Sequence, residues 1–201
     1  VASKLAEYGA DEVHTGLGKT GVVALIHGKS QGNRRVGLRA DMDALPIDEI
    51  SGVPFSSQTP GTMHACGHDA HTTMLLGAAK HLAETRDFDG TAVLIFQPAE
   101  EGLGGAHQMM ADGLFKTFPV YEIYGMHNSP NGKPGTFDIC KGVAMAGAMF
   151  FDAHIRGLGS HAAMPHQSRD TVVIASTLVS QLQTIVSRNV APLDSLSLIH
   201  I

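Results

Sequence analysis

A cluster of metal-binding residue types stands between positions 64 and 71, in the segment His64-Ala-Cys66-Gly-His68-Asp69-Ala-His71. Thiolate and imidazole groups are good ligands for zinc and other first-row divalent metals. A spacing of two residues across a glycine lets Cys66 and His68 turn toward one ion, and Asp69 is placed to orient a ligating imidazole. The alternative is a reduced, buried cysteine among polar groups that cap a helix.

Two adjacent carboxylates, Glu100 and Glu101, follow an apolar segment in Phe96-Gln-Pro-Ala-Glu-Glu-Gly102. Open α/β sheets hold ligands beyond the carboxyl ends of their strands. Because neighbouring side chains on an extended backbone point in opposite directions, one glutamate would bind a metal while the other faces substrate as a proton shuttle. The alternative is an acidic pair that favours the dipole of the next helix.

His127 ends the next apolar segment, in Gly125-Met-His-Asn128, and would project from the same sheet edge. Asp41 and Asp43 add acidic groups after the strand-like segment 36–40. For these two aspartates, capping of a turn is an equally good explanation.

A fourth motif, Gly157-Leu-Gly159-Ser-His161-Ala-Ala-Met-Pro-His166, lies further along the chain. Its two glycines free the backbone to bring His161 close to a ligand. On these residues alone, a hairpin turn with incidental histidines is the alternative.

The segment Gly16–Gly21 is similar to a phosphate-binding loop, but Val13 stands where that loop needs a glycine. Phosphate loops also open a helix. Because a strand-like segment follows here, we expect a loop that leads into a hairpin.

Strand-like and helical segments alternate along the first 147 residues, which predicts an α/β sheet. The segment 36–40 is interpreted as the returning partner of 21–27, and the long loop 41–67 is of a length that is usually functional. Asp69 is expected to cap the helix that follows it. The expected helices are 2–8, 69–84 and 103–111, and the expected strands are 21–27, 36–40, 91–96, 121–126 (buried) and 135–139.

The character of the chain changes near residue 147, where we place a domain boundary between 1–147 and 148–201. Beyond it we expect a half-exposed strand at 150–155, a turn, a long helix at 170–187 and the start of a strand at 196–199.

The composition excludes several classes of protein. Of 201 residues, 43% are hydrophobic and 16% charged, which argues against both a disordered and a membrane protein. The net charge of −5 argues against a nucleic-acid or anionic-membrane surface. The two cysteines are too few for a disulfide framework, and with no signal peptide in view we expect a cytoplasmic protein with Cys140 as a buried free thiol. Because the chain opens on Val1 and stops inside the apolar segment 196–201, we expect a fragment.

Taken together, the motifs resemble those of the aminoacylase-like metallo-amidohydrolases. These include hippurate hydrolases, N-acyl-amino-acid amidohydrolases and plant auxin-conjugate hydrolases, within the larger peptidase family of carboxypeptidase G. The resemblance implies a zinc-peptidase-like catalytic α/β domain, with a mixed sheet flanked by helices, interrupted by a smaller α/β lid domain that dimerises. Its motifs, in this order and spacing, are LRADMDALP (38–46), HACGHDAH (64–71), FQPAEEG (96–102), GMHN (125–128) and GLGSHAAMPH (157–166).

Residue by residue, the resemblance implies a site. His161 resembles the histidine that the lid, usually that of the partner subunit, contributes to the active site. Glu100 is the implied general acid/base. The implied metal ligands are Cys66, His68, Glu101 and His127, and the further candidates for contacts to ligands or substrate are Asp41, Asp69 and His166.

The family's remaining ligand is a histidine further downstream, and His200 does not match its motif, so the site in this chain is expected to be incomplete.

The implied reaction is hydrolysis of the amide bond of an N-acyl amino acid to a carboxylate and a free amino acid. It would use two divalent ions, each of them zinc, manganese, cobalt or nickel. The enzyme is expected to be a homodimer. The alternatives are a non-catalytic metal-binding or interaction module, an inactive truncated product, and a dipeptidase or desuccinylase of the larger family. Glu100 beside Glu101 favours an enzyme, because a structural metal site has no use for a free carboxylate. Cys66 favours the aminoacylase-like branch.

Overall fold

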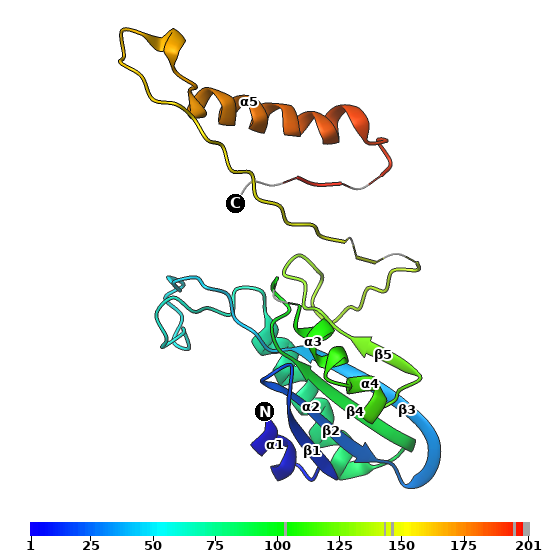
Figure 1. Cartoon of the computed structure of the whole chain (residues 1–201). Coiled ribbons are helices and arrows are strands. Elements are labelled where there is room, and N and C mark those ends of the chain that lie inside the picture. Colours follow the sequence, from blue (N-terminus) through cyan, green and yellow to red (C-terminus); the bar gives the residue numbers. More distant parts are fainter. Residues whose placement is uncertain (103, 143, 146, 195, 199–201) are drawn as a thin grey trace. The chain divides into compact units, whose positions relative to one another are not determined.

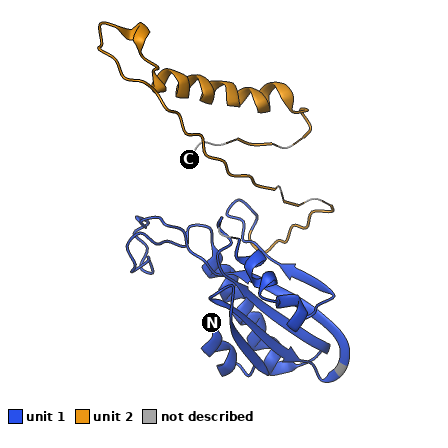
Figure 2. Cartoon of the chain, in the orientation of Figure 1, with its two compact units in different colours: residues 1–133 blue, residues 134–201 orange. Residues whose placement is uncertain are grey.

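The computed structural model describes residues 1–102, 104–142, 144–145, 147–194 and 196–198. The chain forms two compact units, residues 1–133 and 134–201 (Figure 2). The boundary expected near residue 147 falls inside the second unit, and the assignment of 1–147 and 148–201 to catalytic and lid domains stays a prediction. In the described part of the chain, no helix combines the length and the apolar character needed to cross a membrane.

A five-stranded mixed sheet forms the centre of the first unit, in the order β1-β2-β4-β3-β5 (Figure 1). Neighbours β1/β2 and β2/β4 are antiparallel, whereas β3 is parallel to both β4 and β5. The carboxyl ends of β3, β4 and β5 therefore meet at one edge, as the α/β prediction requires. The strands are β1 (Glu12–Leu17), β2 (Gly21–His27), β3 (Ser30–Asp41), β4 (Asp89–Gln97) and β5 (Glu122–Gly125).

Helices cover both faces of this sheet (Figure 1). Alternate residues of β2 and β4 pack against α1 (Ala2–Glu7) and α2 (His68–Thr85) on one face. The residues between them pack against α3 (Gly105–Ala111) and α4 (Leu114–Thr117) on the other. Burial on both faces explains why these two strands are continuous apolar segments rather than alternating ones.

Strand pairing differs from the expectation for segment 36–40, because β4 lies between β2 and β3. The hairpin partner of β2 is instead β1, which the sequence analysis missed. β1 is mostly polar and its residues are half-buried or exposed, so it carries little apolar signal. The turn between them confirms the hairpin expected at Gly16–Gly21.

The last strand is shorter and more exposed than expected. β5 lies at the sheet edge, where β3 is its neighbour in the described sheet, and Ile123 and Tyr124 are exposed. The expectation of a buried strand at 121–126 is therefore wrong. The expected helix at 103–111 is confirmed as α3, although Leu103 lies outside the described residues.

The second unit is built around α5 (Thr171–Thr184). The Asp170 carboxylate accepts hydrogen bonds from the backbone N–H groups of Val172 (2.9 Å) and Val173 (3.3 Å) and so caps the helix. A short π-helical segment, η2 (Ile185–Asn189), continues it, and a 3₁₀ turn, η1 (Pro165–Gln167), precedes it. The helix expected at 170–187 is confirmed.

Three of the other expectations for this part of the chain are wrong. Residues 135–139 and 150–155 form no strand, and Cys140 is exposed. A strand needs a backbone partner, and in the described residues of this unit the bridge between Leu158 and Arg169 is the pairing observed. Residues 196–198 are also irregular, and 199–201, with His200, lie outside the described residues.

Candidate metal centre

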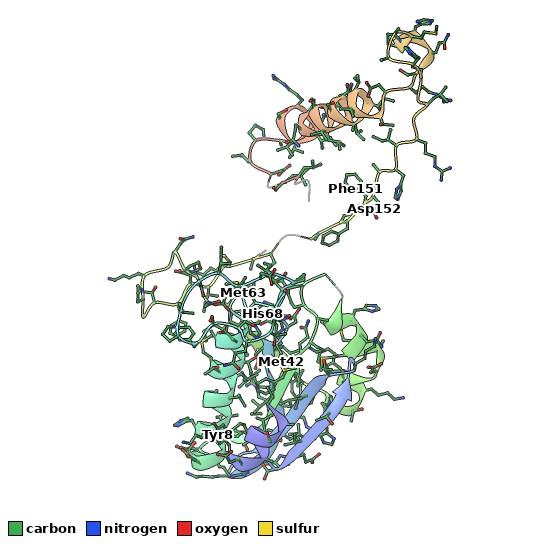
Figure 3. The ribbon with its side chains drawn as sticks, turned by 90° about the vertical axis from the view of Figure 1, so that its left-hand side faces the viewer. Tyr8, Met42, Met63, His68, Phe151 and Asp152 are labelled. Carbon is green, nitrogen blue, oxygen red and sulfur yellow. The ribbon has the colours of Figure 1, made fainter. Side chains whose placement is uncertain are left out.

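Residues that can bind metal meet at the edge where β3, β4 and β5 end. His68 is the first residue of α2, and Figure 3 shows it at that end of the helix. Glu100 and Glu101 follow β4, and His127 follows β5. The ligand atoms of Cys66, His68 and His127 lie within 4.8 Å of one another, as do those of His68, Glu100 and Glu101.

The imidazole of His68 has one nitrogen with no partner. The ring is 1% exposed, and Nδ1 donates to Oδ1 of Asp43 at 3.0 Å. In the neutral ring Nε2 then carries the lone pair, and it has no hydrogen-bond partner among the described residues. It lies 3.9 Å from Oε2 of Glu100 and 3.9 Å from Oε1 of Glu101. Leaving a buried polar atom unpaired costs about 1–3 kcal/mol, which a bound cation would offset.

Cys66 and His127 face each other on the open side of the cluster. Nδ1 of His127 donates to the backbone oxygen of Asn128 at 2.6 Å, so Nε2 keeps its lone pair and lies 3.6 Å from Sγ of Cys66. A tetrahedral zinc ion bound by sulfur and nitrogen would place those two atoms about 3.5 Å apart. The observed separation fits joint coordination of one ion.

The electrostatics of the cluster also favour a cation. Burial, followed by the hydrogen bond to Glu101 and the negative charges of Glu101, Glu100 and Asp41, together raise the pKa of the Cys66 thiol to about 11. In the metal-free protein the thiol is therefore protonated at neutral pH. A divalent ion would neutralise the carboxylates and stabilise the thiolate.

Asp41 lies next to the metal-binding cluster, at the end of β3, and is 2% exposed. Burial raises its pKa, but the hydrogen bond from His71 and the charge of Arg39 outweigh burial, so the pKa is lowered. Oδ1 lies 2.6 Å from Nδ1 of His71, and Oδ2 accepts a bond of 2.9 Å from Nη1 of Arg39. Arg39 also donates to Oε1 of Gln97, through Nε at 2.9 Å and Nη2 at 2.7 Å. With both oxygens bound, Asp41 fixes α2 to the sheet.

The residue that orients His68 is Asp43. Its second oxygen accepts the backbone N–H of Glu101 at 2.9 Å, so one carboxylate ties the start of α2 to the loop after β4. Asp69, which the sequence suggested for this task, is exposed in the first turn. Its expected capping role is wrong as well, since the N-cap is Gly67 at φ 93° with no side-chain capping bond.

The two glutamates do not diverge as expected. Both carboxylates reach the same distance from His68 Nε2. The reason lies in the backbone, because Ala99 has φ 52° and Gly102 has φ 82°, so the loop is coiled rather than extended. The alternation of neighbouring side chains holds only for extended backbone.

The remaining sequence candidates are His64 in the first unit and His161 and His166 in the second. His64 is exposed. In the second unit, His161 Nδ1 accepts the backbone N–H of Ala163 at 3.1 Å, and His166 is exposed in η1. Sequence reasoning did not assign roles to His71 or Asn128. For His71 a signal existed, because a residue three positions after His68 shares its helix face.

Comparisons with known proteins show the family to which the chain is similar. The family model for peptidase family M20/M25/M40 matches residues 37–196. Hippurate hydrolase of Campylobacter jejuni is 48% identical over 195 residues, which are 97% of this chain and 50% of that enzyme. N-acetyl-L-cysteine deacetylase of Bacillus subtilis is 48% identical over 178 residues, 88% of this chain and 42% of that enzyme. The chain thus spans about half the length of the curated relatives it matches.

A solved structure from Bacillus subtilis points the same way. It is described as a dinuclear metal-binding peptidase of the M20 family and is 44% identical to this chain. The match has a TM-score of 0.59 and covers 64% of this chain and 36% of that one.

Proposed function

The chain belongs to peptidase family M20/M25/M40, and from that premise we propose that it carries the metal centre of an amidohydrolase. The substrates are N-acyl amino acids, and the products are a carboxylate and a free amino acid. Support comes from two relatives at 48% identity, a hippurate hydrolase and an N-acetyl-L-cysteine deacetylase, both named for N-acyl amino acids.

The observation that carries the proposal is the unpartnered Nε2 of His68, buried among carboxylates and close to a thiol. Cys66, His68, Glu101 and His127 would hold the metal, and each histidine already donates its other ring nitrogen to an oxygen. That second bond fixes the ring and is typical of metal-ligating histidines. Thiolate, imidazole and carboxylate suit zinc, manganese, cobalt or nickel.

Two divalent ions, when bound, would acidify a water and polarise the scissile carbonyl. Glu100, which we leave outside the ligand set, would take the proton of that water and pass it to the leaving amine, a contribution of about 10²–10⁴ in rate. Asp43 would keep the lone pair of His68 directed into the centre. His161 would donate a hydrogen bond to the developing oxyanion.

We further propose a homodimer formed through the lid (148–201), with His161 supplied by the partner's lid, in the cytoplasm. The exposed apolar side chains of α5, Val172 and Val173 among them, support a protein contact on this helix. Asp69 and His166 stay candidates for contacts to substrate.

Reconstitution tests the proposal. The chain is loaded with zinc, manganese, cobalt or nickel, and release of the amino acid from N-benzoylglycine and N-acetyl amino acids is followed. We expect metal-dependent release that Glu100→Gln lowers by about 10²–10⁴ without loss of metal. Glu84→Gln, an exposed carboxylate of α2, is the matched control.

Two results would contradict the proposal. No binding of zinc, manganese, cobalt or nickel by the unmodified chain would remove the metal centre on which the proposal rests. Full activity of Glu100→Gln would remove Glu100 as the acid/base.

A further inference from the structure

Asn128 lies where the segment after β5 meets the start of α2. A methyl group on Gly67 would lie 2.5 Å from Oδ1 of Asn128 and 2.6 Å from its Nδ2. The side-chain amide therefore rests directly on the backbone of Gly67, which separates Cys66 from His68. Only a residue without a side chain leaves room for this contact, and Gly67 also has φ 93°.

The backbone of Asn128 holds a third proposed ligand. Its carbonyl oxygen accepts the hydrogen bond from Nδ1 of His127 at 2.6 Å. This bond sets the ring so that Nε2 points toward Sγ of Cys66, 3.6 Å away. One residue thus contacts the segment of Cys66 and His68 through its side chain and His127 through its main chain.

His71 anchors Asn128 to the protein core. Its ring is 3% exposed, and Nε2 lies 2.8 Å from Oδ1 and 3.1 Å from the backbone N of Asn128. Nδ1 is bound to the buried carboxylate of Asp41 at 2.6 Å. Asp41 is in turn paired with Arg39 on β3. The position of Asn128 is therefore fixed by α2 and by the central part of the sheet.

We propose that Asn128, anchored by His71, is the positioning residue that sets the distance between His127 and the pair Cys66 and His68. It touches no reacting atom and acts through Gly67 and His127. The inference rests on the proposed function, because it concerns the same centre. An amide suits the task, since it is short enough to lie on Gly67 and polar enough to bond the ring nitrogen of His71.

Cobalt binding tests this assignment without relying on activity. Co²⁺ is titrated into the full chain, with affinity taken from equilibrium dialysis and ligand geometry from the thiolate-to-cobalt and d–d absorption bands. For Asn128→Ala we expect a 10–100-fold loss of affinity and altered bands. Asn128→Asp keeps the size but loses the NH₂ group, and because Nδ1 of His71 donates to Asp41 and Nε2 accepts the backbone N–H of residue 128, this carboxylate should not restore the bands. Asn33→Ala, an exposed asparagine on β3, is the control.

A second pair of variants approaches the same contact from the anchor. His71→Phe keeps the ring but removes both nitrogens, and it should weaken cobalt binding in the same way. His81→Phe, an exposed histidine further along α2, should not. Circular dichroism of each metal-free variant shows whether it is folded. If Asn128→Ala does not fold, the comparison is made with His71→Phe.

The outcomes separate this inference from the proposed function. Cobalt binding that Cys66→Ala abolishes but that Asn128→Ala and His71→Phe leave unchanged, in affinity and in bands, would overturn only the role of Asn128. No cobalt binding by the unmodified chain would overturn both.

Discussion

Replacing Asp43 by asparagine exchanges one carboxylate oxygen for an NH₂ group and should impair the metal centre. Asp43 accepts two hydrogen bonds, from Nδ1 of His68 at 3.0 Å and from the backbone N of Glu101 at 2.9 Å. Asparagine has the same shape but one acceptor and one NH₂ group. Whichever way the amide turns, one of the two donors loses its acceptor.

If the NH₂ group faces His68, it donates to Nδ1 and moves the ring proton to Nε2, which removes the lone pair that would bind metal. If it faces Glu101, two donors oppose each other at the loop that carries the proposed ligand. Hydrogen bonds to charged groups contribute about 1.5–3 kcal/mol. Loss of a group that orients a metal ligand lowers metal affinity about 10–100-fold, a free energy of similar size.

The assay is equilibrium dialysis of zinc with the unmodified chain, Asp43→Asn and Asp69→Asn, together with ¹⁵N NMR of the histidine tautomers. We expect Asp43→Asn to weaken binding within that range. Asp69→Asn should bind as the unmodified chain does, because Asp69 is exposed and, among the described residues, its carboxylate forms no hydrogen bond or ion pair with the His68 ring. Unchanged affinity in Asp43→Asn with a loss in Asp69→Asn would refute the reasoning.

Three further predictions concern the fold. Burial raises the pKa of Asp11, but hydrogen bonds from Arg86 and from a backbone N–H lower it overall, so the stabilisation from Asp11 is present at neutral pH and lost as the pH falls through its folded-state pKa. Because the ion pair of Asp11 with Arg86 is partly exposed, Asp11→Asn should lower the free energy of unfolding in urea by about 1 kcal/mol at most at pH 7. An equal loss at pH 7 and at pH 2 would contradict this. Phe96→Ala removes a fully buried ring of β4 and should lower the free energy of unfolding by about 3–5 kcal/mol; a loss below 1 kcal/mol in urea would mean that this core is not formed. Gly67→Ala should lower both the melting temperature and cobalt affinity, because a left-handed alanine costs about 1–2 kcal/mol and its methyl group meets Asn128; an unchanged melting temperature would argue against the φ of 93°.

The sequence predicts the first unit well where a single physical signal dominates. Continuous apolar segments identified β2 and β4 because both faces of these strands are covered by helices. The expectation that Glu101 and His127 meet at one sheet edge also holds, because β4 and β5 are both parallel to β3.

Pairing order and exposure were harder to predict. The partner of β2 could not be inferred from its own residues, because β1 is polar and half-exposed. The burial expected of β5 depended on neighbours, and in the described sheet it has β3 alone. The strands expected at 135–139 and 150–155 have the right composition, but composition does not supply a hydrogen-bonding partner.

The finer geometry of the centre lay beyond sequence patterns. The sequence suggests that the side chains of Glu100 and Glu101 point in opposite directions. In the structure both carboxylates approach His68, because the backbone at Ala99 is left-handed and the loop is not extended. The choice of Asp43 over Asp69 depends on how the end of β3 meets the start of α2, which is a tertiary contact. The role of Asn128 could not be predicted for the same reason, because the residues that contact it, His71 and Gly67, are distant in the sequence.

The most direct test of the central claim, that Cys66, His68, Glu101 and His127 hold a divalent metal, is X-ray absorption spectroscopy of the zinc-loaded chain. We predict one sulfur neighbour at about 2.3 Å with nitrogen and oxygen neighbours at about 2.0–2.2 Å, and loss of the sulfur shell in Cys66→Ser. A coordination shell of nitrogen and oxygen alone in the unmodified chain would contradict the claim.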